Sequence, residues 1–513
     1  MSWTAPSSAS VGKVRFNLAG NAANGNIQET GDFIYTRVYS IDPIVITDNS
    51  VRPYTLVNRG GVSLITDGTG AAPVLGYTRI QPGTGSTTPA GVAIFGGRTN
   101  GVLVSETGVP ATPALTTGRI YAEVAGVVNT GLAIANPNNS DASITFLYTD
   151  AAGADLGSGS ITIPANRQSA QFLNEPGLNT FPGSTFQGTF SFTSSVPIGV
   201  VALRSYINEH GDFLMSTLPV IDTSVAANTG TLVLPHFADG GGWVTQILLV
   251  NPTDTAMTGT VQYTNYSGAN VTVGSQTTYS VPRRSSQKLA TPGSAAATTV
   301  GAVRIIPAGG GAAPTPLVVF SYKPLGIVVS EAGVPTLSGT AFRMYVESSG
   351  ASGQAGNIQT GIAVANNSTA AATVTFELTN LDGSTTGLPA AATINVPASG
   401  HKGQFLADIF PSGLPNPFKG VLRISTTATG ISVVGLRARY NERVSAEAFI
   451  ITTTPPTLET ASPSSAEFLF PDLANGGGYT TQFILFSGTA GQTATGNLRF
   501  VKPDGTPFSL TVN

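Results

Sequence analysis

The sequence contains no cysteine, which excludes disulfide bonds, thiol chemistry and cysteine-based metal sites. Charged residues make up only 10% of the chain, well below the roughly 25% of an average soluble domain. The net charge of −3 argues against a nucleic-acid-binding protein, because such a protein needs a basic face to neutralise phosphates. No apolar run approaches the roughly 20 residues of a transmembrane helix, so no membrane span is expected.

Histidine is scarce as well, and His210, His236 and His401 lie in unrelated sequence contexts. A histidine metal site needs ligands that cluster, and nucleophilic catalysis needs a positioned base, so neither is expected here. Isolated acidic turns such as Asp150–Gly157 offer too few ligands for calcium. The sequence therefore predicts a protein that is not an enzyme and that has no cofactor.

What the chain does have is many short apolar runs rich in Val, Ile, Thr, Tyr and Phe. Glycine, proline, asparagine and aspartate separate these runs, with 61 glycines and 34 prolines available for turns. Runs of this length and composition predict short β-strands joined by tight turns.

A long internal repeat organises these strands. "GVLVSETGVP" (Gly101–Pro110) recurs as "LGIVVSEAGVP" (Leu325–Pro335), and "LPHFADGGGWVTQ" recurs as "FPDLANGGGYTTQ". Each long unit holds two weaker half-repeats of about seven strands. Seven strands in roughly 110 residues is typical of an immunoglobulin-like sandwich.

The predicted fold class is therefore all-β, with tandem immunoglobulin-like β-sandwich domains. We name the strands of a complete domain A to G. The predicted domains are 1–46, a partial β segment; 47–114, strands D–G of one sandwich; 115–226, 227–338 and 339–461, three complete sandwiches; and 462–513, strands A–C of a sandwich.

The two ends of the chain thus align with complementary parts of one sandwich. Half a sandwich is unstable, because each apolar side chain left in water costs roughly 1.5–3 kcal/mol and an open strand edge lacks hydrogen-bond partners. "FILF" (Phe483–Phe486) is apolar on both faces, as a central strand would be. Both halves therefore need a cover.

Three coverings are possible: the complementary half of a second copy, the other end of the same chain in a closed ring, or ordinary termini with rearranged strands. A head-to-tail contact that does not close gives a filament, and strand addition suits such joints, which favours the second copy. The residues expected at this subunit interface are inward-facing apolar positions of both halves: Phe483, Leu485, Leu498, Phe500, Phe508, Leu510, Val512, Tyr54, Leu56, Leu64 and Ile80.

The first residues, with Trp3, Ala5, Pro6, "GKVRFNLAGNAANG" and "GDFIYT", resemble the end of reeler-like, choice-of-anchor domains of secreted bacterial proteins. The repeats, with "RMYVE", "TGIAVAN", "LRARYNE" and "GGGYTTQFILFSG", resemble the C-terminal repeat regions of large secreted proteins from soil bacteria. The resemblance implies export and the cell surface, and it brings no catalytic or binding residues.

Two repeated motifs are the most chemically loaded stretches of the chain, because each combines Arg with Glu. "LRSYINEHGD" (Leu203–Asp212) and "LRARYNERV" (Leu436–Val444) are interpreted as strand hairpins in which Arg and Glu bridge, with a ligand pocket as the alternative. Glu106 and Glu331, in "SETGVP" and "SEAGVP", are expected to contact the next domain.

The triple-glycine turns are expected to use φ > 0, and the aromatic residue after each, Trp243 or Tyr479, to pack on a neighbouring domain or subunit.

Together these features predict an extracellular or cell-surface structural subunit that polymerises with itself, head to tail, by strand complementation. The alternative is an adhesin or glycan-binding stalk of monomeric repeats, whose partners are surface glycans.

Overall fold

The computed structural model describes residues 14–22, 33–41, 49–443 and 445–513. It contains two compact units, Met1–Asn49 and Ser50–Asn513. In the first unit, β1 (Val14–Ala22) pairs antiparallel with β2 (Phe33–Ile41). The resemblance residues Trp3, Ala5 and Pro6 lie outside the described residues.

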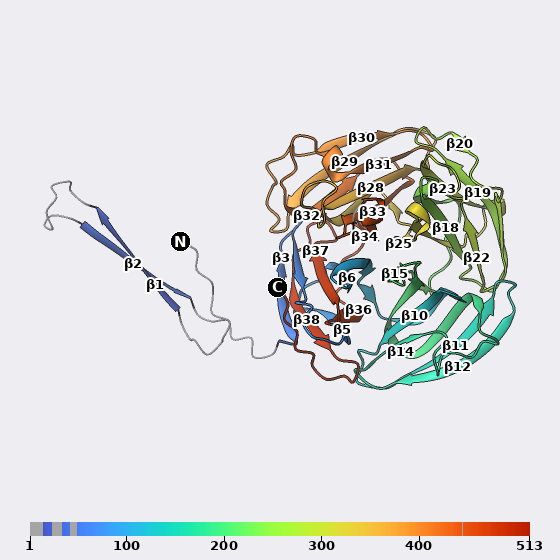
Figure 1. Cartoon of the computed structure of the whole chain (residues 1–513), viewed down its shortest axis with the longest axis horizontal. Coiled ribbons are helices and arrows are strands. Elements are labelled where there is room, and N and C mark those ends of the chain that lie inside the picture. The colour runs from blue at the N-terminus through green and yellow to red at the C-terminus, as the bar shows by residue number, and fades with distance from the viewer. Residues whose placement is uncertain (1–13, 23–32, 42–48, 444) are drawn as a thin grey trace. The chain divides into compact units, whose positions relative to one another are not determined.

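The second unit is all-β, and its antiparallel sheets form several β-sandwiches arranged in a ring (Figure 1). Alternation of buried and exposed side chains explains the strands. In β11, Ala142, Ile144 and Phe146 are buried, while Ser143 and Thr145 between them are exposed. Among the described residues, no helix is long and apolar enough to cross a membrane.

We name four sandwiches. The split sandwich has one sheet of β3 (Val51–Leu56), β38 (Ala494–Val501), β5 (Val74–Pro82), β36 (Phe468–Asn475) and β8 (Thr112–Pro113), and another of β4 (Gly61–Ile65), β37 (Tyr479–Phe486), β6 (Ala90–Thr99) and β7 (Val102–Pro110). The second sandwich contains β9 (Leu115–Ala125), β10 (Val128–Ala135), β11 (Ala142–Asp150), β12 (Asp155–Ile163), β13 (Gln168–Phe172), β14 (Phe186–Ile207), β15 (Phe213–Leu218) and β16 (Ile221–Asp222).

The third sandwich contains β17 (Leu232–Asp239), β18 (Trp243–Val250), β19 (Met257–Thr264), β20 (Asn270–Val271), β21 (Thr278–Val281), β22 (Ser286–Ala290), β23 (Thr299–Pro307), η2 (Ala308–Gly310), β24 (Thr315–Tyr322), η3 (Pro324–Gly326) and β25 (Ser330–Pro335). The fourth contains β26 (Ser338–Gly339), β27 (Ala341–Ser348), β28 (Ile358–Asn366), β29 (Ala372–Asn380), β30 (Ala392–Val396), β31 (His401–Phe405), α1 (Leu406–Ile409), β32 (Phe418–Ser425), β33 (Ile431–Tyr440), η4 (Ser445–Ala448), β34 (Phe449–Thr453) and β35 (Thr457–Leu458).

The strand order differs from that of immunoglobulin domains, whose sheets are ABED and CFG. In the third sandwich, β17, β23 and β19 (strands A, E and C) form one sheet with β21 (D). The other sheet runs β22, β18, β24, β25, which places strand B beside F. The expectation of sandwich architecture therefore holds at the level of antiparallel layers, and immunoglobulin pairing does not describe these sheets.

The split sandwich is completed within one chain. β36, from the C-terminal end, pairs with β5 from the N-terminal end; β37 lies between β4 and β6; and β38 lies between β3 and β5. The expected joint between neighbouring copies is thus replaced by an intramolecular one. The physical reason is the curvature of the ring, which brings the two ends together at a high effective concentration (Figure 1).

A pair of cysteines tests this closure directly, since the native chain has none. Thr55 and Thr495 are exposed register partners of β3 and β38. The Thr495 backbone bonds to Ser86 and Gly83, away from Thr55, so the two residues form the close, non-hydrogen-bonded kind of pair at about 4.5 Å, within disulfide range. The Thr55→Cys/Thr495→Cys variant is expected to oxidise to a cross-linked monomer in non-reducing electrophoresis. Each single variant is the control, and a ladder of oligomers from the double variant would contradict closure within one chain.

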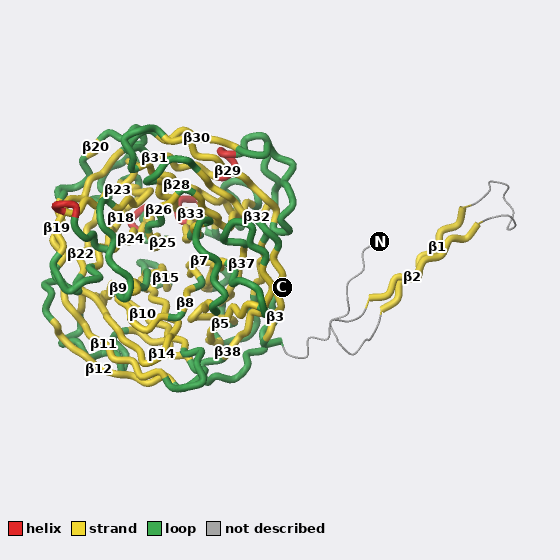
Figure 2. The backbone as a smooth tube through the Cα atoms, turned by 180° about the vertical axis from the view of Figure 1, so that it is seen from behind, coloured by secondary structure: helices red, strands yellow, loops and turns green. Residues whose placement is uncertain are grey.

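Four edge strands meet at the centre of the ring: β7, β15, β25 and β34, one from each sandwich, each touching the next in turn (Figures 1 and 2). Their backbones come very close. A Cβ added to Gly108 would lie 1.9 Å from the Thr453 carbonyl oxygen, and one added to Gly333 would lie 1.9 Å from that of Thr217. Glycine in the repeated "SETGVP" and "SEAGVP" segments thus permits the central contact.

Candidate functional site: two cavities between sandwiches

The eleven predicted interface residues lie together inside the split sandwich. Ten of them are buried in one apolar cluster, and Leu64 packs against it partly buried. The structure therefore brings N-terminal and C-terminal positions together as the core of one chain's sandwich.

The two faces of β37 are both buried, but against different neighbours. Phe483 and Leu485 face the core of the split sandwich, whereas Ile484 and Phe486 join a cluster with Tyr345 of the fourth sandwich. The apolar "FILF" segment therefore serves one core and one contact between sandwiches.

The charged repeat motifs form buried ion pairs between sandwiches. Glu106 Oε2 lies 2.8 Å from Arg437 Nη1, and Glu331 Oε2 lies 3.0 Å from Arg204 Nη1, with all four side chains at most 4% exposed. Glu106 and Glu331 thus contact neighbouring sandwiches, as expected. The interpretation of bridges inside each hairpin is corrected, because each arginine pairs with a glutamate of another sandwich.

A β-bulge and a glycine turn build one wall of the larger cavity, which lies between the third and fourth sandwiches. Pro235 has no N–H to donate, and the register of β17 shifts between Leu234 and Phe237. Gly240, Gly241 and Gly242 then turn the chain with φ of 81°, 60° and 90°. These features carry His236 and Trp243 to the cavity wall.

This cavity, which we call the His cavity, has a volume of about 680 Å³. Aromatic residues form much of its lining. Trp243 packs edge-on against Phe449 of the fourth sandwich, with ring centroids 6.3 Å apart, which confirms the expected contact of this residue with another domain. Phe405 and Tyr266 are 39% and 69% exposed, so their rings are available to a ligand.

Two histidines from different sandwiches meet at this wall. His236 Nδ1 and His401 Nε2 lie 3.0 Å apart, and their rings stack at 5.1 Å. Burial lowers the pKa of His236 to about 4, and burial together with the adjacent His236 lowers the pKa of His401 to about 3. Both rings are therefore neutral at neutral pH. No group of three or more His, Cys, Asp or Glu side chains in the described ranges could hold a metal ion.

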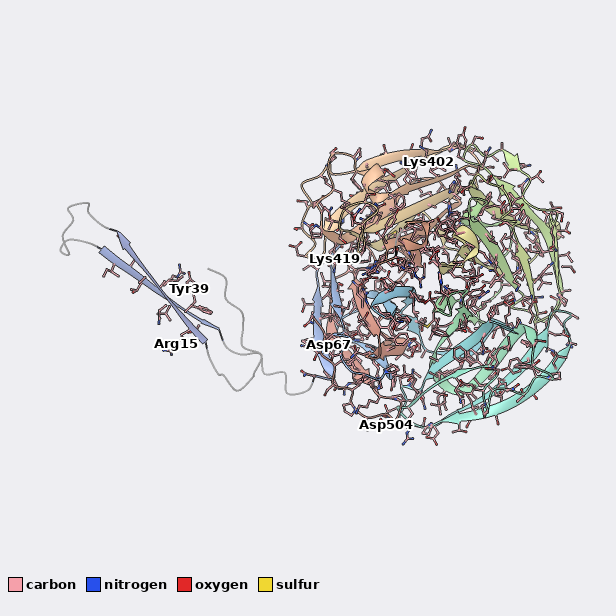
Figure 3. The ribbon with its side chains drawn as sticks, viewed as in Figure 1. Arg15, Tyr39, Asp67, Lys402, Lys419 and Asp504 are labelled. Carbon is pink, nitrogen blue, oxygen red and sulfur yellow. The ribbon has the colours of Figure 1, made fainter. Side chains whose placement is uncertain are left out.

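The histidine pair leaves one polar atom without a hydrogen-bond partner within the described part of the chain. In either tautomer one imidazole donates to the other, so Nδ1 of His401 is left as a donor or as an acceptor. That atom is buried and has no hydrogen-bond partner within the described part of the chain, and the same holds for Gln404 Oε1. The charged residues that line the cavity are Lys402, labelled in Figure 3, and Asp408.

A second cavity, of about 300 Å³, occupies the corresponding place between the split and second sandwiches. The sequence repeat relates the two. β36 has the same bulge between Phe470 and Leu473, and the second triple-glycine turn precedes Tyr479. Asp472 stands where the His cavity has His236. We call this second space the acidic cavity.

The sequence interpretation missed both cavities. It treated the three histidines as unrelated, since His236 and His401 lie 165 positions apart and meet only across two sandwiches. A usable signal was present: the repeat places a polar residue, His236 or Asp472, directly after proline in the same strand, where a bulge is expected.

No family model matches the chain, and no curated protein matches it. Among solved structures, the chain is similar to Thermotoga maritima 1070, at 12% identity over 24% of this chain and 98% of that chain, with a TM-score of 0.19. A subviral particle of infectious bursal disease virus VP2 matches at 10% identity over 77% and 84%, with a TM-score of 0.11. A glycoside hydrolase family 32 structure from Bifidobacterium adolescentis matches at 8% identity over 75% and 99%, with a TM-score of 0.12. Likeness at these TM-scores carries no argument about function.

Proposed function

We propose that this chain is a non-catalytic extracellular binding protein whose His cavity holds a neutral saccharide. The observation that carries the proposal is the aromatic-lined cavity between two sandwiches, with the polar residues Lys402, Gln404 and Asp408 in its lining. Pockets for small ligands combine apolar walls with a few placed polar groups, and this cavity has both.

The aromatic rings suit the apolar faces of a sugar. Phe405 and Tyr266 expose large ring surfaces from opposite sandwiches, and Trp243 lies on the wall that carries His236. A pyranose presents C–H groups on its faces and hydroxyls at its rim. Stacking of rings against the faces removes apolar surface from water.

The polar groups suit the hydroxyl rim. A hydroxyl can donate and accept, so it suits the side chains of Lys402, Gln404 and Asp408, which line the cavity. Both histidines are neutral at neutral pH because their pKa values are about 4 and 3, which favours a neutral ligand.

The number of carboxyl groups in the lining favours binding over hydrolysis. Glycoside hydrolysis commonly needs two carboxyl groups flanking the bond that breaks. Asp408 is the one carboxylate among the residues that line the His cavity, and it accepts a hydrogen bond from the Phe405 backbone.

Removal of an exposed ring tests the proposal with little risk to folding. Phe405→Ala and Tyr266→Ala are each expected to weaken binding of the best neutral saccharide about tenfold or more, because aromatic anchors dominate binding energy. A glycan array identifies that saccharide, and isothermal titration calorimetry measures the variants. Binding should not change between pH 7 and pH 5, since both histidine pKa values lie below that range.

The control is Tyr479→Ala, which removes an aromatic residue of the other cavity, at the position that corresponds to Trp243. It should leave saccharide affinity unchanged. If no neutral saccharide binds the native protein, or if Phe405→Ala and Tyr266→Ala both bind as tightly as the native chain, the proposal is wrong.

A structural role in a surface assembly is the second candidate, and the N-terminal hairpin favours it. Leu18, Ile34, Tyr35 and Val38 of β1 and β2 are each more than half exposed. A two-stranded hairpin is marginal in water, so added strands or a partner surface would stabilise it. This role predicts fibres in electron micrographs of the full chain and none in a chain that starts at Ser50; single particles in both would count against it.

A further inference from the structure

The acidic cavity differs sharply from the His cavity in charge. Asp472 and Glu175 line it, and its lining residues include no Lys, Arg or His. Four aromatic residues share the wall: Phe95, Phe172, Phe213 and Tyr479. Leu75, at 41% exposed, lies among the lining residues, so the space communicates with solvent.

The two carboxyl groups lie near opposite ends of β13. Gln168 Nε2, at the start of the strand, donates to Asp472 Oδ1 at 3.4 Å, while the Phe172 backbone N–H, at its end, donates to Glu175 Oε2 at 3.2 Å. Four residues of strand rise place these ends roughly 13 Å apart. Among the described residues, neither carboxyl group forms an ion pair with a basic side chain.

We propose that the acidic cavity binds a linear aliphatic diamine or polyamine, with one ammonium group at Asp472, the other at Glu175, and the methylene chain along the aromatic wall. Two unpaired carboxyl groups in a partly desolvated space call for two cations. The apolar wall between them suits a carbon chain, and the ring faces attract ammonium groups.

A bound ammonium group would also offset the energetic cost of an ionised Asp472 in this poorly solvated position. Burial raises the pKa of Asp472 to about 6, since an ionised carboxylate is poorly solvated there. An ammonium group beside it stabilises the charged form, so binding strengthens as the pH rises through about 6. Glu175 and Tyr479 are the other titratable residues of the lining. The repeated architecture thus carries two chemistries, neutral at His236 and His401 and anionic at Asp472.

Titration calorimetry on the full chain tests the proposal with putrescine and spermidine, and with n-butylamine as the singly charged control. Spermidine or putrescine should bind at least about tenfold more tightly than n-butylamine, because one end of the site stays unpaired with a monoamine. Spermidine binding should weaken when the pH falls from 7.5 to 5. Preference between the two polyamines reports chain length, and either preference supports the site.

Two isosteric variants locate the ligand. Asp472→Asn and Glu175→Gln should each weaken polyamine binding about tenfold or more. Phe405→Ala, in the other cavity, should leave it unchanged. Glu175 is only half-buried in a turn, so its variant stays informative if Asp472→Asn proves unstable.

The proposal is overturned if no polyamine binds, if n-butylamine binds as tightly as spermidine, or if Glu175→Gln has no effect. Its failure is separate from that of the saccharide proposal, because the two use different ligands and different variants.

Discussion

Replacement of Glu106 by Ala is expected to lower the free energy of unfolding of the ring by about 3–5 kcal/mol. Glu106 pairs with Arg437 at 2.8 Å, and both side chains are nearly inaccessible, at 4% and 3% exposed. Its other oxygen lies 2.9 Å from Arg439. Loss of the carboxylate would leave the buried Arg437 with only Glu347, 3.5 Å away, as a counter-ion, which is far costlier than the loss of a solvated pair.

The effect should be read against an exposed pair in the same molecule. Asp254 lies 3.4 Å from Arg284 and its side chain is 77% exposed, so Asp254→Ala should cost less than about 1 kcal/mol. Glu331→Ala, at the repeat-related position, should match Glu106→Ala because Glu331 pairs with a buried Arg204. Guanidinium denaturation followed by circular dichroism measures all three. If Glu106→Ala and Asp254→Ala lowered the free energy of unfolding equally, the stabilising role of the buried Glu106–Arg437 pair would be contradicted.

The local sequence pattern predicted a large part of this fold. Alternation along β38 identified Leu498 and Phe500 as inward positions, and both are fully buried. Apolar alternation reports which side of a strand is covered, because successive side chains point to opposite faces. It does not report what covers the other side. For Ile484 the cover is the fourth sandwich, which no local pattern names.

The same limit explains why the sequence favoured completion by a second copy, whereas the structure pairs the two ends within one chain. The repeat showed that strands A–C and D–G belong to one sandwich, and a sandwich completed by a second copy has the same pattern as one completed within the chain. The deciding quantity is the angle between successive sandwiches. That angle depends on contacts such as Gly108 against Thr453, where two sequence-distant backbones approach closely.

The sequence could not predict the cavities, for a related reason. Each is lined by residues of two sandwiches, so its chemistry is absent from any single stretch of sequence. His236 and His401 acquire their lowered pKa values only when the interface buries them together. The repeat could locate one wall through its bulge and its glycine turn, but the facing wall, with Phe405 and Gln404, follows only from the ring.

Deletion of Thr480–Asn513 should have the largest effect of all, because it removes nearly all of β37 and all of β38 from the split sandwich. The lost core side chains include Phe483, Leu485, Leu498 and Phe500, each worth about 1.5–3 kcal/mol when buried. Their sum is comparable with the whole stability of a typical domain, about 5–15 kcal/mol. We therefore expect residues 50–113 to lose their fold.

Limited proteolysis with mass spectrometry measures this outcome region by region. Residues 50–113 should become rapidly cleaved, and the ring should open at the contact between Ile484 and Tyr345 of the fourth sandwich. The second and third sandwiches keep their own buried clusters and their mutual contact, so they should remain resistant. The matched control is a chain that starts at Ser50, which lacks the N-terminal hairpin and should stay resistant throughout the ring. Persistent protection of residues 50–113 after the C-terminal deletion would mean that the two ends do not share a core, and closure of the ring by strand pairing would be wrong.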